Sequence, residues 1–232
     1  MIASLVGSEM CIRDRNMSEV SLVALSKPSA ITDCNTAAEL VAYTARVSNP
    51  TNQNNTATAP KLLGYLIRED HWSPFEMVHM TMEIKTTRDI ARQILRHRSF
   101  SFQEFSQRYA EATEWETREA RLQDLKNRQN SMETDDPEIN EMWNIVQKKL
   151  IKNAEDAYNW ALEQGIAKEQ ARAVLPEGNT MSTLYMAGSL RSWIHYCQLR
   201  TGNGTQKEHI KVAEKCWEII EQHFPDVVKA LR

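Results

Sequence analysis

The segment 78–86 alternates between apolar and polar residues. Val78, Met80, Met82 and Ile84 take every second position, and polar residues stand between them. Successive side chains of a strand point to opposite faces of the sheet, so this period of two predicts a strand with one buried face. Such a strand requires partner strands and a covering layer, and the run therefore constrains the fold more than any other segment.

Most of the remaining chain has helical periodicity. A proline opens two of these stretches, and a glycine follows the longest one, as is common at helix ends. The predicted helices are Thr36–Val47, Ala59–Arg68, Thr87–Arg98, a long one from Pro137 to Gly165, Leu190–Leu199, and a last one carrying Ile210, Ala213, Trp217 and Ile220. Further strands are predicted at Val20–Leu25 and Thr180–Ala187. The expected fold class is α+β, a small mixed or antiparallel sheet with several long helices in a single domain.

The long helix and the segment before it carry two more specific expectations. Charged residues from Glu111 to Asp136 predict an exposed excursion. In the helix, a stripe of apolar residues predicts the buried face: Ile139, Trp143, Val146, Leu150, Ala154, Ala157 and Ala161.

Composition argues against several classes of protein. The chain has 232 residues, is 41 % hydrophobic and carries a formal net charge of -3, a size that suits one well-buried core. An acidic balance disfavours a protein that works mainly by binding nucleic acid or anionic membrane. No apolar run approaches the roughly 18–20 residues of a membrane span, and we expect a cytoplasmic protein.

The first sixteen residues differ in character from the rest. Their stretch "GSEMCIRDR" resembles translated sequencing-adapter sequence, so we expect Met17 to be the start, residues 1–16 to lie outside the fold and residues 17–232 to form the domain. The four cysteines, Cys11, Cys34, Cys197 and Cys216, form no CxxC pair and have no histidine at metal-ligand spacing. We interpret them as reduced thiols and expect no metal site.

Basic residues cluster in the stretch "RQILRHRSFSFQEFSQR", which runs from Arg92 to Arg108. One reading is a helix end, where cations complement the dipole by roughly 0.3–1 kcal/mol. However, Arg88, Arg92 and Arg96 repeat at spacing of four and repel one another unless an anion or Asp89 offsets them. The hydroxyls, amides and aromatic rings that follow could hold a phosphate and a planar ring. A ligand site is therefore the second reading.

This stretch resembles the signature of the flavin-dependent thymidylate synthases, an RHR followed by seven residues and a serine, here "RHRSFSFQEFS" ending at Ser106. "HWSPFEM", "RQILRHR", "ARAVLP" and "LRSWIHYCQLR" resemble further blocks of that family, in the family's order. The resemblance implies a homotetramer with active sites shared between subunits. It also implies reductive methylation of dUMP to dTMP, with 5,10-methylenetetrahydrofolate as carbon donor and FAD, reduced by NADPH, as hydride carrier.

The resemblance also implies the site residues. The positions that match the flavin site are Ser48, His71, Ser73, Arg96, His97, Arg98, Glu104, Ser189, Arg191 and His195. The positions that match the dUMP site are Gln93, Arg96, Glu104, Ser106, Arg108, Arg172 and Arg200. At Ser189 and His195 the family often has asparagine, and both side chains here can still hydrogen-bond. Arginine suits a phosphate because its guanidinium is always charged and donates two parallel hydrogen bonds.

Arg200 matches the arginine that faces the uracil ring, so the resemblance implies a catalytic role. A fixed cation there would stabilise the negative charge that develops at N3 and the adjacent carbonyl, which makes C5 the nucleophile. The alternative is a solvated arginine that caps the 190–199 helix. His71 is open between the flavin site and a turn, while His79 is read as structural.

Ser106 and Cys197 could each be taken for a nucleophile. No base is evident beside Ser106, which fits a phosphate-binding hydroxyl better. Cys197 lies on an apolar stripe and is read as a small core residue.

Two other functions remain open at this point. The arginines could track phosphates of RNA while Phe100, Phe102 and Phe105 stack on bases, although the acidic total charge counts against this. A structural helical protein without a ligand is the third reading.

Overall fold

The computed structural model describes residues 12–13 and 18–232. Cys11, Met17 and most of the predicted leader lie outside the described residues. Ile12–Arg13 form strand β1, which pairs in parallel with β5 (Trp115–Glu116). The expectation that residues 1–16 do not belong to the fold stays a prediction.

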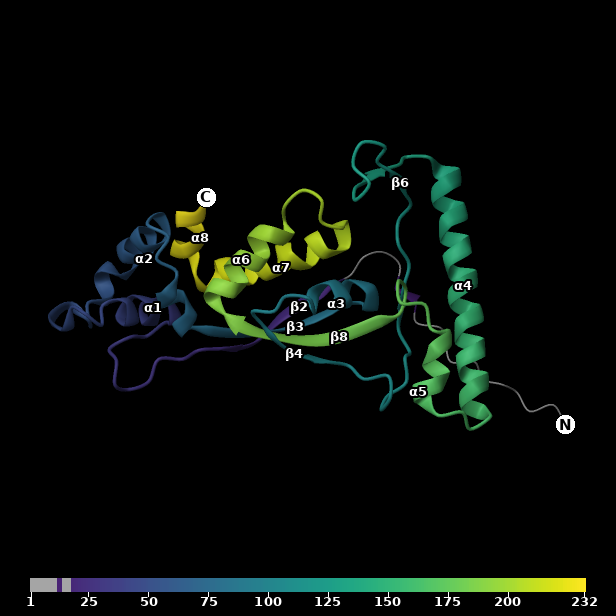
Figure 1. The fold of residues 1–232 in the computed structure, drawn as a ribbon, viewed down its shortest axis with the longest axis horizontal. Helices are drawn as coiled ribbons and strands as arrows, with labels where there is room; N and C mark the ends of the chain where they lie inside the picture. The colour runs from purple at the N-terminus through teal and green to yellow at the C-terminus, as the bar shows by residue number, and fades with distance from the viewer. Residues whose placement is uncertain (1–11, 14–17) are drawn as a thin grey trace. The chain divides into compact units, whose positions relative to one another are not determined.

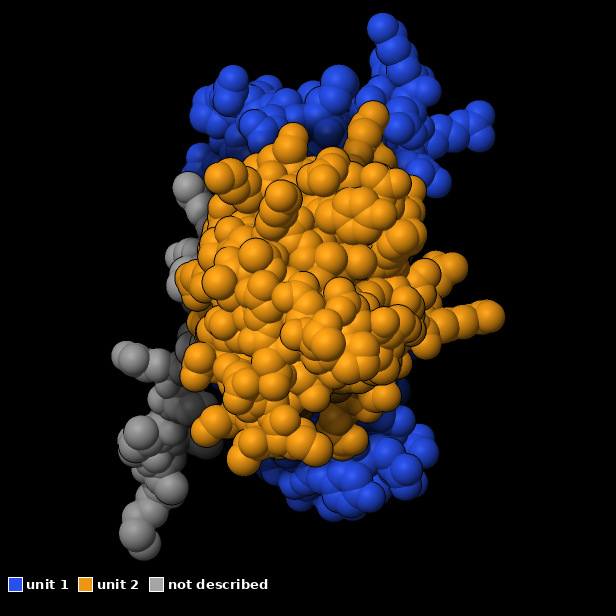
Figure 2. All heavy atoms as spheres, turned by 90° about the vertical axis from the view of Figure 1, so that its left-hand side faces the viewer, with its two compact units in different colours: residues 1–17, 86–92, 104–183 blue, residues 18–85, 93–103, 184–232 orange. Residues whose placement is uncertain are grey.

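The chain divides into two compact units, coloured separately in Figure 2. Unit 1 contains residues 1–17, 86–92 and 104–183, and unit 2 contains residues 18–85, 93–103 and 184–232. Each unit is therefore assembled from segments that are distant in the sequence.

A four-stranded sheet has the strand order β2 (Glu19–Leu25), β3 (His79–Thr87), β8 (Met181–Ser189) and β4 (Ser101–Glu104). Strands β2 and β3 pair antiparallel, with an irregularity in register between Leu22 and Ala24. The apolar residues of β3 that alternate in the sequence, Met80, Met82 and Ile84, are fully buried, which confirms the predicted strand and its buried face.

The helices of unit 2 agree closely with the predicted ones, except that the last of them, α8, was not predicted. They are α1 (Ala37–Ala45), α2 (Ala59–Arg68), α6 (Leu190–Arg200), α7 (Lys207–His223) and α8 (Pro225–Leu231), with short 3₁₀ turns η1 (Pro50–Asn52), η2 (Thr56–Thr58) and η3 (Ser73–Met77). A capping box of Thr36 and Glu39 starts α1. Helix α7 packs against β2 and against α6 (Figure 1).

Helix α3 (Arg88–Ile94) is shorter than predicted. The expectation of a helix to Arg98 is wrong, because the chain turns after Ile94 and the His97 amide donates to the Ile94 carbonyl at 3.0 Å. Residues Arg96–Arg98 therefore lie in a turn. Ile90 and Ile94 are fully buried and anchor the helix, whereas Arg96 and Arg98 are exposed and add nothing to its buried face.

Unit 1 is built around the long helix α4 (Pro137–Glu163), visible in Figure 1. The short elements α5 (Lys168–Ala171) and η4 (Arg172–Val174) pack on it. Asp136 caps its N-terminus by accepting from the amides of Glu138 and Ile139.

The predicted buried face of α4 is wrong over its first half and at Ala157, which is exposed. Ile139, Trp143, Val146 and Leu150 are 40–51 % exposed. The buried residues include Ala154 and Ala161, as predicted, together with Gln147, Ile151 and Tyr158, which were not predicted. An apolar stripe shows which face of a helix is apolar, but it does not show whether other segments of the chain cover that face.

The segment 111–136 is less exposed than its charge predicts. Trp115, Glu116 and Thr117 are buried. Gln147 of α4 accepts from the Arg118 amide and donates to the Arg118 carbonyl, both at 2.8 Å. The exposed part is a hairpin of β6 (Arg121–Gln123) and β7 (Ser131–Glu133).

The expected α+β class is confirmed by the small sheet and the helices. Across residues 18–232, no helix is both long enough and apolar enough to pass through a lipid bilayer.

Candidate active site

A groove of about 530 Å³ opens in unit 2 between η3, the turn after α3 and the start of α6. Predicted flavin-site residues Arg98 and Ser189 line it, together with Ser99, Ser101 and Ser192. The His79 side chain, read as structural from the sequence, also lines it. A cation beside several hydroxyl donors is suited to an anionic oxygen such as that of a phosphate.

His97 and Arg200, which are far apart in the sequence, are hydrogen-bonded in unit 2. The Arg200 Nε donates to the His97 Nε2 at 2.8 Å. A ring nitrogen that accepts is unprotonated, so His97 is neutral. Burial, and then the charge of Arg200, lower the pKa of His97 to about 4. The result is a permanent cation held beside a neutral imidazole.

Arg191 and His195 lie on one face of α6, as their spacing of four predicts. The Arg191 guanidinium forms an ion pair with Glu76 of η3. The His195 ring contacts Trp72 edge-on, with 4.7 Å between centroids, and burial lowers its pKa. Trp193 and Cys197, on the opposite face, are buried.

Ser189 caps α6, since its Oγ accepts from the Ser192 amide at 3.3 Å. Helix capping alone explains why a serine stands at position 189, and no ligand is needed to explain it. Ser189 also lines the groove.

Ser48, His71 and Ser73 are among the eight predicted flavin-site residues that do not line the groove. Ser48 follows α1, His71 precedes η3 and Ser73 begins it, and all three are exposed. The His71 ring is 6.1 Å from the Tyr65 ring, edge to face. Both readings of His71 stay predictions.

Unit 1 holds four of the predicted nucleotide-site residues: Glu104, Ser106, Arg108 and Arg172. The Glu104 carboxylate accepts from the Ser182 hydroxyl at 2.9 Å and pairs with Arg88 at 3.4 Å. The Ser106 hydroxyl accepts from the Arg108 amide at 3.4 Å. These contacts fix Glu104 and tie Ser106 to the turn after β4.

Glu169 of α5 brings Arg108 and Arg172 together. Its carboxylate pairs with the Arg108 guanidinium at 3.3 Å, and its carbonyl accepts from the Arg172 Nε at 3.3 Å. Two guanidinium groups beside one residue can converge on a dianion such as a phosphate monoester. The Arg108–Glu169 pair is half exposed, so an incoming anion could replace the carboxylate at little cost.

A model of the family described as "Thymidylate synthase complementing protein" matches residues 30–226 of the chain. The chain is 54 % identical over 211 residues to a "Probable flavin-dependent thymidylate synthase" of Paramecium bursaria Chlorella virus 1, covering 90 % of this chain and 97 % of that protein. It is 51 % identical over 215 residues to a "Flavin-dependent thymidylate synthase" of Synechocystis sp. PCC 6803, covering 92 % and 99 %.

The chain belongs to the flavin-dependent thymidylate synthase family. The resemblance seen in its sequence is thereby confirmed. A solved structure with the same fold is the UMP/dUMP methylase PolB from Streptomyces cacaoi bound with 5-Br dUMP. It superposes with a TM-score of 0.79 at 28 % identity, and the match covers 94 % of this chain and 95 % of that one.

Sequence reasoning missed the partners of Gln93 in this flavin-dependent synthase. The Gln93 Nε2 donates to Gln206 at 2.8 Å, and its Oε1 lies 3.3 Å from the Nδ1 of His209. A signal for His209 was present, because it shares a helix face with the buried Val212 and Cys216 of α7. A histidine on an apolar stripe is a buried polar group that needs partners.

Cys197 is a core residue, as its position on the stripe predicted. It is 1 % exposed, and burial raises the pKa of its thiol well above the ordinary value. The nucleophilic form is the thiolate, which this environment disfavours.

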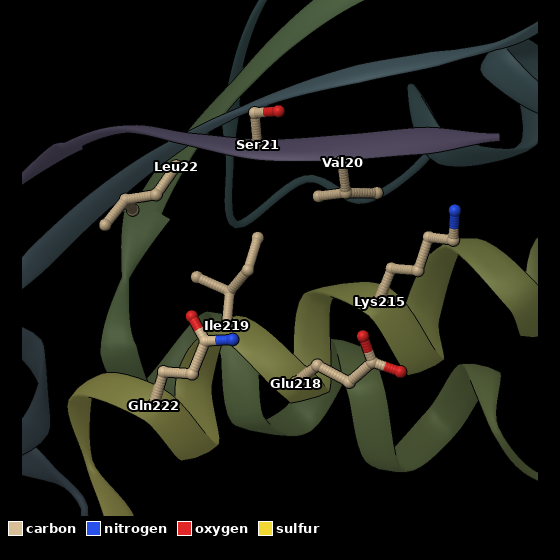
Figure 3. Close-up of a pocket in the computed structure, with 7 residues that line it drawn as sticks. All are labelled: Val20, Ser21, Leu22, Lys215, Glu218, Ile219 and Gln222. Carbon is tan, nitrogen blue, oxygen red and sulfur yellow. The ribbon is translucent and has the colours of Figure 1, made fainter.

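A second hollow lies between β2 and α7, and none of the predicted site residues lines it. Figure 3 shows Val20 and Ile219 pointing toward each other there, while Ser21 points away. Lys215 donates to the Ser18 carbonyl. The hollow holds one lysine beside Glu218, so its charges are balanced and it is a weaker anion site than the groove at Arg98.

Proposed function

We propose that this chain methylates dUMP to dTMP, with 5,10-methylenetetrahydrofolate as the one-carbon donor and FAD, reduced by NADPH, as the hydride carrier. We further propose that it acts in the cytoplasm as a homotetramer. The observation that carries the proposal is the Arg200–His97 pair, a fixed cation beside a neutral ring, in a chain of the flavin-dependent thymidylate synthase family.

The residues around the groove fit a phosphate-bearing flavin. Arg98 and the hydroxyls of Ser99, Ser101 and Ser189 would hold anionic oxygens. Arg191 has a buried Nε without a hydrogen-bond partner within the described residues, and such a donor suits an acceptor on a ligand. When bound and reduced, the flavin would supply the hydride that converts the transferred carbon into a methyl group.

Arg200 would polarise the substrate. Its Nε donates to His97. This hydrogen bond fixes the orientation of the guanidinium and leaves its two terminal amino groups available for the substrate. Aimed at the uracil carbonyl next to N3, they would stabilise negative charge in the ring and so make C5 nucleophilic. His97 can hold Arg200 in this way only while its ring is neutral, and its lowered pKa keeps it neutral at pH 7.

The nucleotide phosphate would be held by Arg108 and Arg172, with Ser106 as a hydroxyl donor. Support comes from the shared contact of both arginines with Glu169. Gln93, Arg96 and Glu104 would complete the nucleotide site. The remaining flavin contacts proposed are Ser48, His71, Ser73, Arg96, His97, Glu104 and His195.

The exposed apolar face of α4 supports the homotetramer. Ile139, Met142, Trp143, Val146 and Leu150 are each 40–53 % exposed on one stretch of this helix. A contiguous patch of this kind commonly marks a protein–protein interface. A second copy of the chain would remove it from water.

The visible absorption spectrum tests the cofactor. We expect the purified protein to show flavin bands that bleach when NADPH is added without oxygen, and dTMP to form once dUMP and the folate are supplied. A protein that stays colourless after incubation with FAD would refute the proposal and favour the nucleic-acid reading of the arginines.

Cys197→Ala is expected to form dTMP at a rate close to that of the unchanged protein. The thiol is buried and held in its protonated form, so a mechanism without a thiol nucleophile does not use it. Turnover assays of the two proteins at equal flavin content check this. Complete loss of dTMP formation in a normally folded variant would overturn the proposed mechanism.

A further inference from the structure

Five polar side chains of unit 2 form one hydrogen-bonded series. The Tyr196 hydroxyl lies 3.0 Å from the His209 Nε2, and the His209 Nδ1 lies 3.3 Å from the Gln93 Oε1. The Gln93 Nε2 donates to the Gln206 Oε1 at 2.8 Å, and the Gln206 Nε2 donates to the Glu208 carboxylate at 2.9 Å.

The carboxylate of Glu208 sets the direction of every bond in the series. A carboxylate only accepts, so Gln206 must turn its amide nitrogen toward it and its oxygen toward Gln93. Gln93 then donates to Gln206 and presents its own oxygen to His209. His209 must therefore carry its proton on Nδ1, and its bare Nε2 accepts from the Tyr196 hydroxyl.

Burial makes this arrangement costly to reverse. His209 is 0 % exposed, and Glu208 and Tyr196 are each 2 % exposed. Gln93 and Gln206 are half-buried. Flipping either amide would place two donors or two acceptors against each other, and the buried His209 or Glu208 would lose a hydrogen bond. Burial also lowers the pKa of His209 to about 3, in agreement with a neutral ring.

The series is in contact with the proposed catalytic pair. The Tyr196 ring packs edge-on against His97 with 4.9 Å between centroids, and His97 accepts from Arg200. One buried polar cluster thus connects the catalytic candidate with Gln93, a proposed nucleotide ligand.

We propose that His209 is a positioning residue that fixes the orientation of the Gln93 amide, so that Gln93 offers a donor to the nucleotide. The Oε1 and Nε2 of Gln93 are each engaged once, by His209 and Gln206, so one N–H and one lone pair of Oε1 remain. The proposal assigns the remaining N–H to the nucleotide, where its partner would be an acceptor such as a carbonyl oxygen of a uracil ring. This inference rests on the proposed function only in taking the ligand to be dUMP.

The tautomer of His209 tests the orientation in the absence of any substrate. Long-range ¹H–¹⁵N correlation spectra of the flavin-loaded protein, with His209 assigned by its loss in His209→Asn, are expected to show a proton on Nδ1 and a bare Nε2. A proton on Nε2, or a charged ring at pH 7, would overturn the inference. The result does not depend on whether the protein makes dTMP.

Substitutions at His209 test the consequence for dUMP. His209→Phe keeps a ring but removes both hydrogen bonds, and we expect the dissociation constant for dUMP to rise about 10-fold, the equivalent of roughly 1.4 kcal/mol. His209→Asn places an amide nitrogen where Nδ1 was and is expected to recover most of the affinity. The matched control His223→Phe replaces an exposed histidine and should bind dUMP as the unchanged protein does.

The outcomes separate the two proposals. Equal dUMP affinities in the Phe and Asn variants, whether both weakened or both unchanged, would overturn the role of His209. The reason is that the Asn variant keeps a donor to the Gln93 oxygen and the Phe variant does not. If the unchanged protein itself bound no dUMP, the proposed function would fail, and the tautomer measurement would still decide whether His209 orients Gln93.

Discussion

Replacing Arg200 with alanine is expected to lower the rate of dTMP formation by roughly 100-fold or more, the usual cost of removing a preorganised group that stabilises developing charge. The guanidinium is permanently charged and is held by His97 at 2.8 Å, so it does not have to be reoriented during the reaction. The measurement is single-turnover formation of dTMP by the Arg200→Ala protein at saturating dUMP.

The same variant has a second expected effect, on the pKa of His97. The Arg200 charge is the smaller of two causes that lower this pKa, after burial. Without the guanidinium, the pKa of His97 should rise from about 4 part of the way toward its ordinary value of 6.5, which NMR titration of the ring can follow. Burial of the ring prevents a complete return.

The control for Arg200 is Arg68→Ala, which removes an exposed arginine in the last turn of α2 and should leave turnover unchanged. Flavin content and melting temperature of the Arg200 variant show whether it is folded and loaded. Normal turnover by a folded, flavin-loaded Arg200→Ala protein would show that the role proposed for this residue is wrong.

Replacing Gly188 with alanine is expected to destabilise the protein by about 1–3 kcal/mol, the usual cost of overpacking. A Cβ at this position would lie 2.4 Å from the Phe100 Cδ1 and 2.7 Å from its Cε1. The Phe100 ring cannot retreat easily, because its other neighbours include Trp193, at 4.9 Å between centroids, which is fully buried. The melting temperature should fall by roughly 2–10 °C.

The clash at Gly188 should also weaken flavin binding. Phe100 lies between Ser99 and Ser101, which line the same groove as Arg98, so a displaced ring moves the donors proposed for the flavin. Flavin occupancy after purification measures this effect. We expect the second substitution Phe100→Leu, which shortens the clashing side chain, to restore part of both stability and occupancy.

Gly178→Ala is the matched control for Gly188→Ala, because a Cβ at position 178 would meet no atom within 4 Å. It should change the melting temperature little. Equal melting temperatures for the two variants would contradict the close packing of Phe100 on Gly188.

Local patterns predicted the elements well where these depend on residues within one segment. The period of two in β3 and the bounds of α2, Ala59–Arg68, follow from side-chain alternation and from a proline in the first turn. The buried face of α4 did not follow from the periodicity of its apolar residues. Its first half buries Gln147 and exposes Trp143, because Gln147 satisfies the backbone of Arg118, and no periodicity encodes such a pairing.

The site shows the same division between local and long-range information. The motif around Arg96–Arg98 identified the family and the residue types that its chemistry needs. The sequence could not predict which of those residues are in contact, since His97 and Arg200 are separated by 103 positions. Likewise, the helix end at Ile94 moved Arg96–Arg98 into a turn, where their side chains are no longer held at helical spacing.

By itself, the sequence determined the fold class, most of the helices and strands, the family, and the candidate residues, because these depend on periodicity and on motifs within short segments. Only the tertiary structure decided which side chains meet: Arg200 with His97, Arg191 with Glu76, and His209 with Gln93. The physical reason is that burial, which sets both the hydrogen-bond directions and the lowered pKa values of His97 and His209, is produced by packing between segments distant in the chain.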